Sequence, residues 1–535
     1  MHGGQRKAAG AAGGKIGLCL ILALLLPSAC MKVGPDFVKP DAPVSPDWLD
    51  ARDSRLDSAP VDYRAWWRVF DDPVLDRLID TAFRQNLSVR IAGVRVLEAR
   101  AQLGIAVGLL YPQSQLAYGS LQYNRISERS PQAVVSSNLT YAQSQAGLAA
   151  SWELDFWGRF RRAVESADAG LSATIADYDN TLVSLTGDVA NAYVLIRTLE
   201  KRIDIARQNI ETQRESLKIA EARFRGGTAS QRDVEQATTL LNNTQASTPT
   251  LEAQLRQAKN ALSVLLGLPP GDLTGMLTGV SAAIPVPPRR IAVGIPADLL
   301  RRRPDIRSAE YQAMAQGALI GVARADLFPA FSLNGTFGFL SSNVGGSGLG
   351  DMFRWGSRTY SAGPGAQWNL FNYGRLTNHV RVQDARFQQL LIGYQEIVLK
   401  AQQEVEDALV AFLRAQERAE FLGLSAVAAR RSLDLAIVQY RGGVTDFTTV
   451  LTAQQALLNE QDNLVSTLGN ISQNLVGVYR ALGGGWQVRE EMDMVPPEIK
   501  ETMAKRTNWG NLLSPAVYKP PEYEESLPLI RSPDW

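Results

Sequence analysis

Few residues of this chain could take part in covalent or metal chemistry. Its 535 residues include two histidines, at positions 2 and 379, and two cysteines, at positions 19 and 30. Removal of residues 1–29 as a signal peptide would leave one of each. That composition excludes an intrachain disulfide, a Cys/His zinc cage and most histidine-based triads. We find no catalytic constellation, so we expect a protein that is not an enzyme and that uses no cofactor and no metal.

Cys30 is the residue at which a covalent modification is expected. Basic residues precede an apolar run over Ile16–Leu26, which suits a secretory signal peptide and is too short to span a membrane. Small residues directly before Cys30 are typical of a bacterial lipoprotein signal, although Pro27 stands where an aliphatic residue is usual. We therefore predict lipid attachment at Cys30. The alternative is an ordinary signal peptide with an incidental cysteine.

The overall composition narrows the class of protein. From Cys30 onward the chain has 52 basic and 54 acidic side chains, so it carries no electrostatic footprint for nucleic acid. Hydrophobic residues make up 45% and charged residues 20% of the chain, which excludes both a disordered chain and a polytopic helical membrane protein. An exported chain without spanning helices can still cross a membrane as a β-barrel.

The chain contains an internal duplication. Three pairs of segments recur at an interval of 216 or 217 residues: Trp152–Arg159 with Trp368–Arg375, Phe224–Gly227 with Tyr440–Gly443, and Tyr111–Pro112 with Phe328–Pro329. Such an interval is far longer than the roughly 20–50 residues of a solenoid repeat. We expect one repeat over residues 71–270, a linker over 271–295 and a second repeat over 296–486.

Each repeat has a long helix with a seven-residue hydrophobic period. In the first repeat the period runs from Ile175 to Phe224, and adding 216 reproduces it in the second repeat. Eight heptads without a stutter predict coiled-coil packing, and a helix over 159–225 would be roughly 100 Å long. A return helix over about 229–266 and an earlier helix over about 86–108 would together form the partner column. Pro249 should kink the return helix or remove a hydrogen bond.

Between the helices the period changes from seven to two. Alternating apolar and polar residues predict strands over about 143–155, 329–340 and 358–371, with a bulge at Pro364 in the last of them. A first strand is expected over about 113–124, although it alternates poorly. Trp152, Trp157 and Trp368 near the strand ends fit an interfacial aromatic girdle. The alternative is a soluble sandwich with one wet face. Four strands cannot close a barrel, so a membrane-spanning chain of this kind must oligomerise.

The paired glycines of each repeat should form the tips of two αα-hairpins, over 226–230 and 442–446. The candidate binding residues there are Arg225, Gly226, Gly227, Thr228 and Ser230 in the first tip, and Arg441, Gly442, Gly443 and Val444 in the second. The alternative is that they only reverse and cap the helices. Asp446 could narrow or screen a pore, or could simply cap the following helix.

Other segments have simpler interpretations. Arg301, Arg302, Arg303 and Asp305 favour a salt-bridged helix start, and the glycines of 345–350 favour an extracellular loop over a nucleotide site. Residues 30–70 should run extended. Residues 487–535 are rich in Pro and Glu and should form an irregular C-terminal tail.

With these elements in place, the sequence resembles the outer membrane factors, the TolC-like exit ducts of bacterial export pumps. The nearest branch is that of the lipoproteins serving resistance-nodulation-division (RND) efflux pumps. The segments that carry the resemblance are Cys30–Pro40, Trp66–Pro73, Phe224–Val234, Leu300–Glu310 and Ala481–Trp486. Thr445 and Thr452 stand where relatives often carry Asp.

The resemblance implies an α+β membrane protein and a homotrimer. Three chains would build a 12-stranded outer membrane β-barrel and a periplasmic α-helical barrel. The two tips would dock on a periplasmic adaptor (membrane fusion) protein, and an inner-membrane RND transporter would supply the energy. Opening would be an iris-like rotation in which the second repeat, about 376–482, moves.

Two other functions stay open at this point. A type I protein secretion duct would have the same architecture, but Cys30 and the Val33-Gly34-Pro35 opening favour small-molecule efflux. A soluble coiled-coil scaffold is opposed by the alternating strands and the export signal. The exported substrate is not indicated: drugs, dyes, aromatic acids and metal ions all remain possible.

Overall fold

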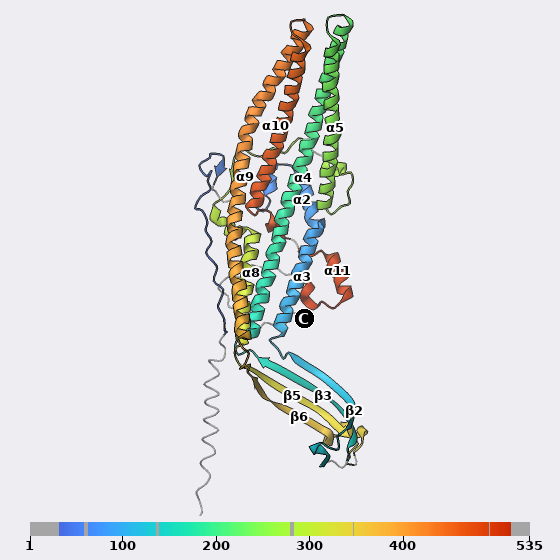
Figure 1. Ribbon diagram of the computed structural model, residues 1–535, viewed down its shortest axis with the longest axis vertical. Helices are drawn as coiled ribbons and strands as arrows, with labels where there is room; N and C mark the ends of the chain where they lie inside the picture. The colour runs from blue at the N-terminus through green and yellow to red at the C-terminus, as the bar shows by residue number, and fades with distance from the viewer. Residues whose placement is uncertain are drawn as a thin grey trace, which may run out of the picture.

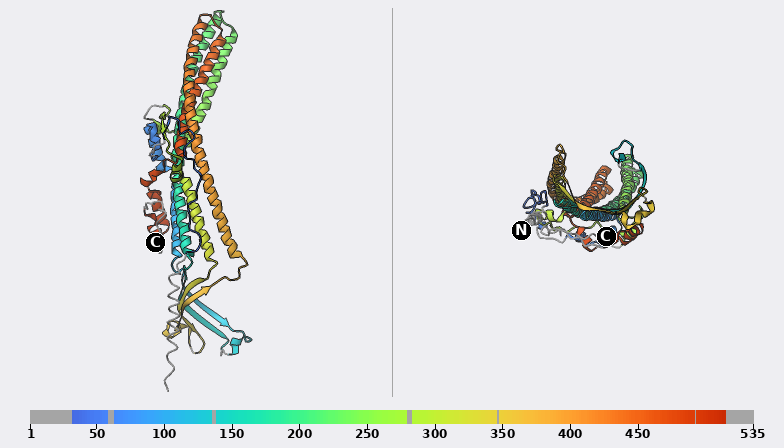
Figure 2. Two further views of the ribbon diagram at one scale, coloured as in Figure 1. Left: turned by 90° about the vertical axis from the view of Figure 1, so that its left-hand side faces the viewer. Right: turned by 90° about the horizontal axis from the view of Figure 1, so that it is seen from below.

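The chain forms long paired helices that end in a small β-sheet. The computed structural model describes residues 32–57, 63–134, 138–278, 283–345, 347–491 and 493–514, so Cys30 and the predicted signal peptide lie outside the described residues. Figure 1 shows the hairpin tips at one end of the molecule and the sheet at the other. Seen from the sheet end, helices and sheet follow an arc that is open on one side (Figure 2).

The two long helices are equal in length. Helix α4 (Arg159–Arg225) and helix α9 (Arg375–Arg441) have 67 residues each, and each follows a glycine with positive φ. The heptad seam accounts for their burial, because seam residues such as Val189, Ile196 and Phe412 are fully buried. The return helices α5 (Gln231–Leu265) and α10 (Phe447–Ala481) have 35 residues each, and α5 continues through Pro249.

Shorter helices complete the two columns. Helix α3 (Leu87–Gly108) lies below α5, and helix α8 (Pro304–Ala325) lies below α10 (Figure 1). Helix α2 (Pro73–Gln85) begins at Asp72, whose carboxylate accepts from the Val74 amide at 2.9 Å. The chain turns from α5 through Gly267, whose φ is +72° and whose position leaves no room for a Cβ beside the Gln85 carbonyl.

The described residues form one four-stranded antiparallel sheet. Its strands are β2 (Ser114–Arg125), β3 (Thr140–Leu154), β5 (Ala330–Ser342) and β6 (Arg358–Gln367), in the order β2-β3-β5-β6. The predicted bulge at Pro364 is wrong: Pro364 pairs with Leu333 in an unbroken register. The register passes through Pro364 without an extra residue, and among the described residues β6 lies at the edge of the sheet, where a proline is tolerated.

A belt of irregular segments surrounds the middle of the helices. Residues 32–57 run along α4, α8 and α9 and end in β1 (Leu56–Asp57), which pairs in parallel with β4 (Ile291–Ala292). Two short helices, α6 (Thr274–Leu277) and α7 (Leu299–Arg302), belong to the same belt. The start of α8 is salt-bridged as predicted, with Arg303 2.7 Å from Asp305 and 2.8 Å from Glu404.

The C-terminal segment differs from the predicted irregular tail. Helix α11 (Pro497–Arg506) packs against α3, with Met503 and Val495 buried beside Leu97. Proline at the first helical position accounts for where it starts. The tail therefore contains a docked helix among the residues that the structure describes.

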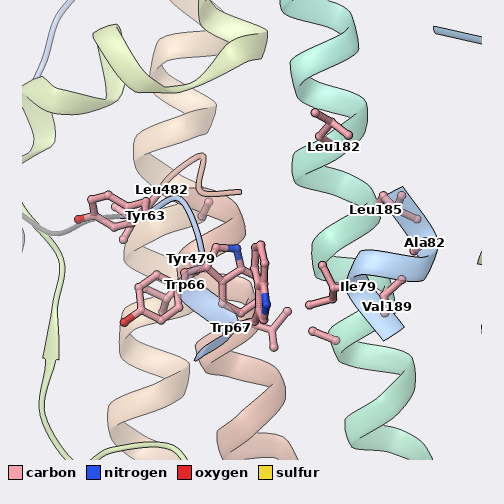
Figure 3. Close-up of a cluster of buried hydrophobic side chains, with 14 of the residues drawn as sticks. Tyr63, Trp66, Trp67, Ile79, Ala82, Leu182, Leu185, Val189, Tyr479 and Leu482 are labelled. Carbon is pink, nitrogen blue, oxygen red and sulfur yellow. The ribbon is translucent and has the colours of Figure 1, made fainter. Parts of the chain in front are cut away.

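The largest hydrophobic cluster contains residues of the 63–70 segment and of helices α2, α4 and α10. The Trp66 ring stacks on Tyr479 with ring centroids 5.3 Å apart, and Ile79 of α2 faces Val189 of α4 (Figure 3). Gly484 lies against Trp66, where a Cβ would come within 2.9 Å of the indole. The core thus joins both repeats where the four helical columns meet.

Candidate functional site

The first hairpin tip is a glycine-terminated helix end. The Thr228 amide donates to the Arg223 carbonyl at 2.9 Å, and the Gly227 amide donates to Phe224 at 2.9 Å. Gly227 has φ +71°, so the last turn of α4 closes as a Schellman motif, which requires a left-handed residue. Ser230 then begins α5, and its hydroxyl donates to Asp233 at 3.0 Å.

The second tip repeats this geometry. The Val444 amide donates to the Gln439 carbonyl at 2.9 Å, and Gly443 has φ +75°. Asp446 caps α10, because its carboxylate accepts from the amide and the hydroxyl of Thr449 at 3.2 and 3.0 Å. The carboxylate of the candidate gate residue is therefore engaged in capping, although it remains exposed.

The structure brings the predicted tip residues together at one end of the molecule. All of them are exposed: Arg225, Gly226, Gly227, Thr228 and Ser230 in the first tip, and Arg441, Gly442, Gly443, Val444 and Asp446 in the second. Val444 keeps 78% of its side chain accessible. Two exposed arginines and an exposed valine on rigid turns offer a partner both cationic and apolar contacts.

A contact between the tips was not predicted from the sequence. The Arg223 guanidinium lies over the Tyr440 ring, 4.6 Å from its centroid, and donates to the Tyr440 carbonyl and, at 3.4 Å, to the Thr228 carbonyl. Tyr440 is buried, and this desolvation raises the pKa of its phenol. The sequence contains one difference between the repeats that could have indicated this contact. The counterpart of Arg223 is Gln439, and the counterpart of Tyr440 is Phe224.

Polar contacts also join the two hairpins below the tips. They connect α4 with α10 through the pairs Arg202–Asp462 at 2.7 Å, Asn209–Gln461 at 2.8 Å, Ser216–Gln454 at 2.7 Å and Asp188–Arg480 at 2.9 Å. Gly469 allows close helix packing, because a Cβ there would fall 2.3 Å from the Thr198 hydroxyl. The hairpins are thus joined by these polar links and, nearer the tips, by a hydrophobic cluster that contains Ala220 of α4 and Phe447 of α10.

The sheet at the other end has two chemically different faces. Leu148, Trp152, Phe337 and Tyr360 share one face by strand register and are accompanied mainly by apolar residues. The opposite face carries mainly polar or small residues, including Ser151 and Asn334, whose side chains hydrogen-bond at 2.7 Å. The apolar face is largely uncovered, with Leu148 62% and Tyr360 74% exposed.

Two further properties concern the residues that the structure describes. No helix among them contains a stretch apolar and long enough to cross a membrane. Within the same residues, no three His, Cys, Asp or Glu side chains gather in a way that could hold a metal ion.

Comparison with known proteins identifies the chain's family. The model of the family described as outer membrane efflux protein matches residues 78–268 and 295–484. This chain belongs to that family. Both matched segments carry one long helix and one tip, so the duplication lies within the family architecture. An outer membrane efflux protein is a channel component rather than an enzyme.

This chain aligns with nearly the whole length of several named relatives. The pyoverdine export outer membrane protein OpmQ of Pseudomonas putida is 33% identical over 88% of this chain and 97% of that protein. The solvent efflux pump outer membrane protein SrpC of Pseudomonas putida is 32% identical over 88% and 98%. The chain is therefore an outer membrane efflux channel protein.

Solved structures agree with this fold. The outer membrane channel OprN superposes with a TM-score of 0.79 at 32% identity, over 85% of this chain and 99% of that one. The open state of the Neisseria gonorrhoeae channel MtrE superposes with a TM-score of 0.70 at 28% identity, over 85% and 98%.

Proposed function

We propose that this chain is the passive exit duct of a tripartite efflux system that expels small molecules. Three copies form the duct. The curvature of the single chain supports this, because the arc in Figure 2 is one segment of a tube. In this system the energy for transport comes from an inner-membrane RND transporter.

The sheet supports the trimer. Its two outer strands, β2 and β6, have no partner among the described residues on one side, and unpaired backbone is not tolerated in lipid. Joining the β6 edge of one copy to the β2 edge of the next removes all edges and gives twelve strands from three chains. The apolar face then faces lipid and the polar face lines the pore. Lipid on Cys30 anchors the duct to the same membrane.

The tips dock on a periplasmic adaptor protein. Exposure of Arg225, Arg441 and Val444 at the far end from the sheet supports this assignment. The polar links between α4 and α10 keep the periplasmic end closed, and α9 with α10 moves outward when they break. Asp446 borders this aperture. The substrate is a small organic molecule, a class suggested by the relatives named for pyoverdine export and solvent efflux.

Export assays on tip variants test this function. Gly227→Leu places a side chain at φ +71°, and its Cβ would meet no atom within 4 Å, so the substitution acts first on the turn. We expect lower drug resistance in cells and weaker crosslinking to the adaptor, with an intact trimer. The matched control is Gly226→Ala, whose φ is −80° and whose Cβ makes ordinary contacts. Unchanged export and crosslinking for Gly227→Leu would show that the tip is only a turn.

A further inference from the structure

The loop between β6 and α9 exposes a group of large apolar side chains. Tyr373 is 100% exposed, Phe371 90%, Leu370 60% and Trp368 55%. Tyr373 also has φ +50°, a left-handed conformation that is uncommon for a bulky residue. Strain of this kind persists where surrounding structure holds it, and the described part of the chain leaves Tyr373 uncovered.

The matching loop of the first repeat is covered. Trp157, the counterpart of Tyr373 at an interval of 216, stacks on Phe328 with ring centroids 4.6 Å apart. Its indole N–H donates to the Pro329 carbonyl at 2.8 Å. This contact joins the first repeat to the second at the helix end of the β3–β5 pairing, where Leu154 pairs with Phe331.

The surroundings of the two loops correspond closely. The Trp152 indole donates to the Leu110 carbonyl at 3.1 Å, and the Trp368 indole donates to the Leu327 carbonyl at 3.0 Å. Gly158 and Gly374 close the two loops with φ of +76° and +79°. The residues that follow Leu110 and Leu327 are Tyr111-Pro112 and Phe328-Pro329, so Tyr111 is the counterpart of Phe328.

Strand register extends the same correspondence to the sheet edges. Ser114 pairs with Ser151, and Ala330 pairs with Gln367, so both hairpins map onto each other with an interval of 216. Ser151 of the first repeat pairs with Asn334 of the second. At the same interval of 216, the counterpart of Ser151 is Gln367 of β6 and the counterpart of Asn334 is Tyr118 of β2. Gln367 and Tyr118 lie on opposite edges of one sheet. These two residues can meet only between two copies of the chain.

We propose that Tyr373 of one copy stacks on Tyr111 of the next copy, as Trp157 stacks on Phe328 within the chain. The exposed loop over 368–373 is therefore an interface for a second copy of this chain, and it continues between chains the interface that joins the two repeats. This inference rests on the proposed trimer. It adds the residues that seal the junction of the sheet and the helices between neighbouring copies.

Photocrosslinking of the full chain in detergent tests the contact. Benzoylphenylalanine replaces Tyr373, and the mass of the wild-type assembly is measured by light scattering. We expect a two-chain adduct that maps to the peptide containing Tyr111. The same probe at Phe353, an exposed aromatic residue at the other end of the sheet, should give no adduct at that peptide. A trimer that gives no Tyr111 adduct overturns this inference alone, whereas a monomer overturns the proposed function.

A second measurement keeps the test independent of the probe. Tyr373→Ala should produce a several-fold rise in the fraction of dissociated chains on heating, because an aromatic contact is lost at each junction. Tyr373→Trp, which copies Trp157, should retain the stability of the wild-type assembly. Phe353→Ala is the matched control and should have no effect. Equal dissociation of the wild type and of both Tyr373 variants overturns the proposal.

Discussion

Asp462 on α10 accepts two hydrogen bonds from the guanidinium of Arg202 on α4, from Nε at 2.7 Å and from Nη2 at 3.0 Å. The pair joins the two hairpins and is partly exposed. A bidentate pair between charged groups is specific in its geometry and contributes about 1 kcal/mol at such a site. It is therefore strong enough to bias the closed arrangement and weak enough to be broken by a partner.

Removing this link should favour opening of the periplasmic end. Asp462→Asn should raise the open population roughly fivefold, because about 1 kcal/mol of closed-state stabilisation is lost. The measurement is single-channel conductance of the purified trimer in planar bilayers. Arg207 and Glu252, 3.0 Å apart, form an ion pair within the first hairpin, so Glu252→Gln is the matched control. Equal conductance for Asp462→Asn and the wild type would assign closure to other contacts.

Local periodicity predicted the long elements because it repeats without interruption. The heptads and the paired glycines predicted a helix over 159–225, and α4 has those bounds. Alternation predicted β3, β5 and β6 to within a few residues, apart from the start of β3 and the end of β6, whereas the expected strand that corresponds to β2 alternates poorly. Each of these signals lies within one stretch of chain and needs no knowledge of its neighbours.

What could not be predicted depends on contacts between distant segments. The bulge at Pro364 was wrong because the register between β5 and β6, which the sequence does not show, passes through the proline without an extra residue. The Arg223–Tyr440 contact joins two hairpins, so no period in one of them indicates it. Helix α11 had a usable signal in Pro497, but its docking on α3 depends on Met503 finding Leu97. Lipid attachment at Cys30 stays a prediction.

The buried carboxyl of Asp179 should make stability depend on pH. Asp179 is fully buried, 2.5 Å from Arg489 and 3.5 Å from Arg307. Burial raises its pKa from an ordinary 3.8 to about 6, against the opposing effect of Arg489. The folded state thus binds the proton more tightly than the unfolded state. The contribution to stability is full below about pH 4 and is lost as the pH rises to about 6.

Thermal unfolding between pH 4 and 7.5 measures this effect. A tenfold change in proton affinity is worth about 1.4 kcal/mol, so the loss across this range is at most about 3 kcal/mol. Asp179→Asn cannot titrate, so its destabilisation relative to the wild type should be smaller at pH 7 than at pH 4. A difference that does not change with pH would mean that the carboxyl keeps an ordinary pKa in the fold.

Gly267 should tolerate no side chain. A Cβ there would lie 2.3 Å from the Gln85 carbonyl oxygen, and its φ of +72° adds backbone strain. Gly267→Ala should therefore destabilise the belt by about 2 kcal/mol or more, measured as a lower midpoint of thermal unfolding. The nearby Gly271 has only an ordinary contact at 3.7 Å. Gly271→Ala should leave the midpoint unchanged, and equal effects of the two variants would contradict this packing argument.

The Arg223–Tyr440 contact should restrain the second tip separately from adaptor docking. Arg223→Gln copies the second repeat and removes both the stacking on Tyr440 and the hydrogen bond to its carbonyl. A contact of this type contributes about 1–2 kcal/mol, so hydrogen exchange of the amides over 440–447 should accelerate roughly five- to thirtyfold. Arg225→Gln changes an exposed side chain two residues away, and it should weaken crosslinking to the adaptor without changing this exchange. Unchanged exchange in Arg223→Gln would mean that the Schellman turn at Gly443 holds the tip without help from the first hairpin.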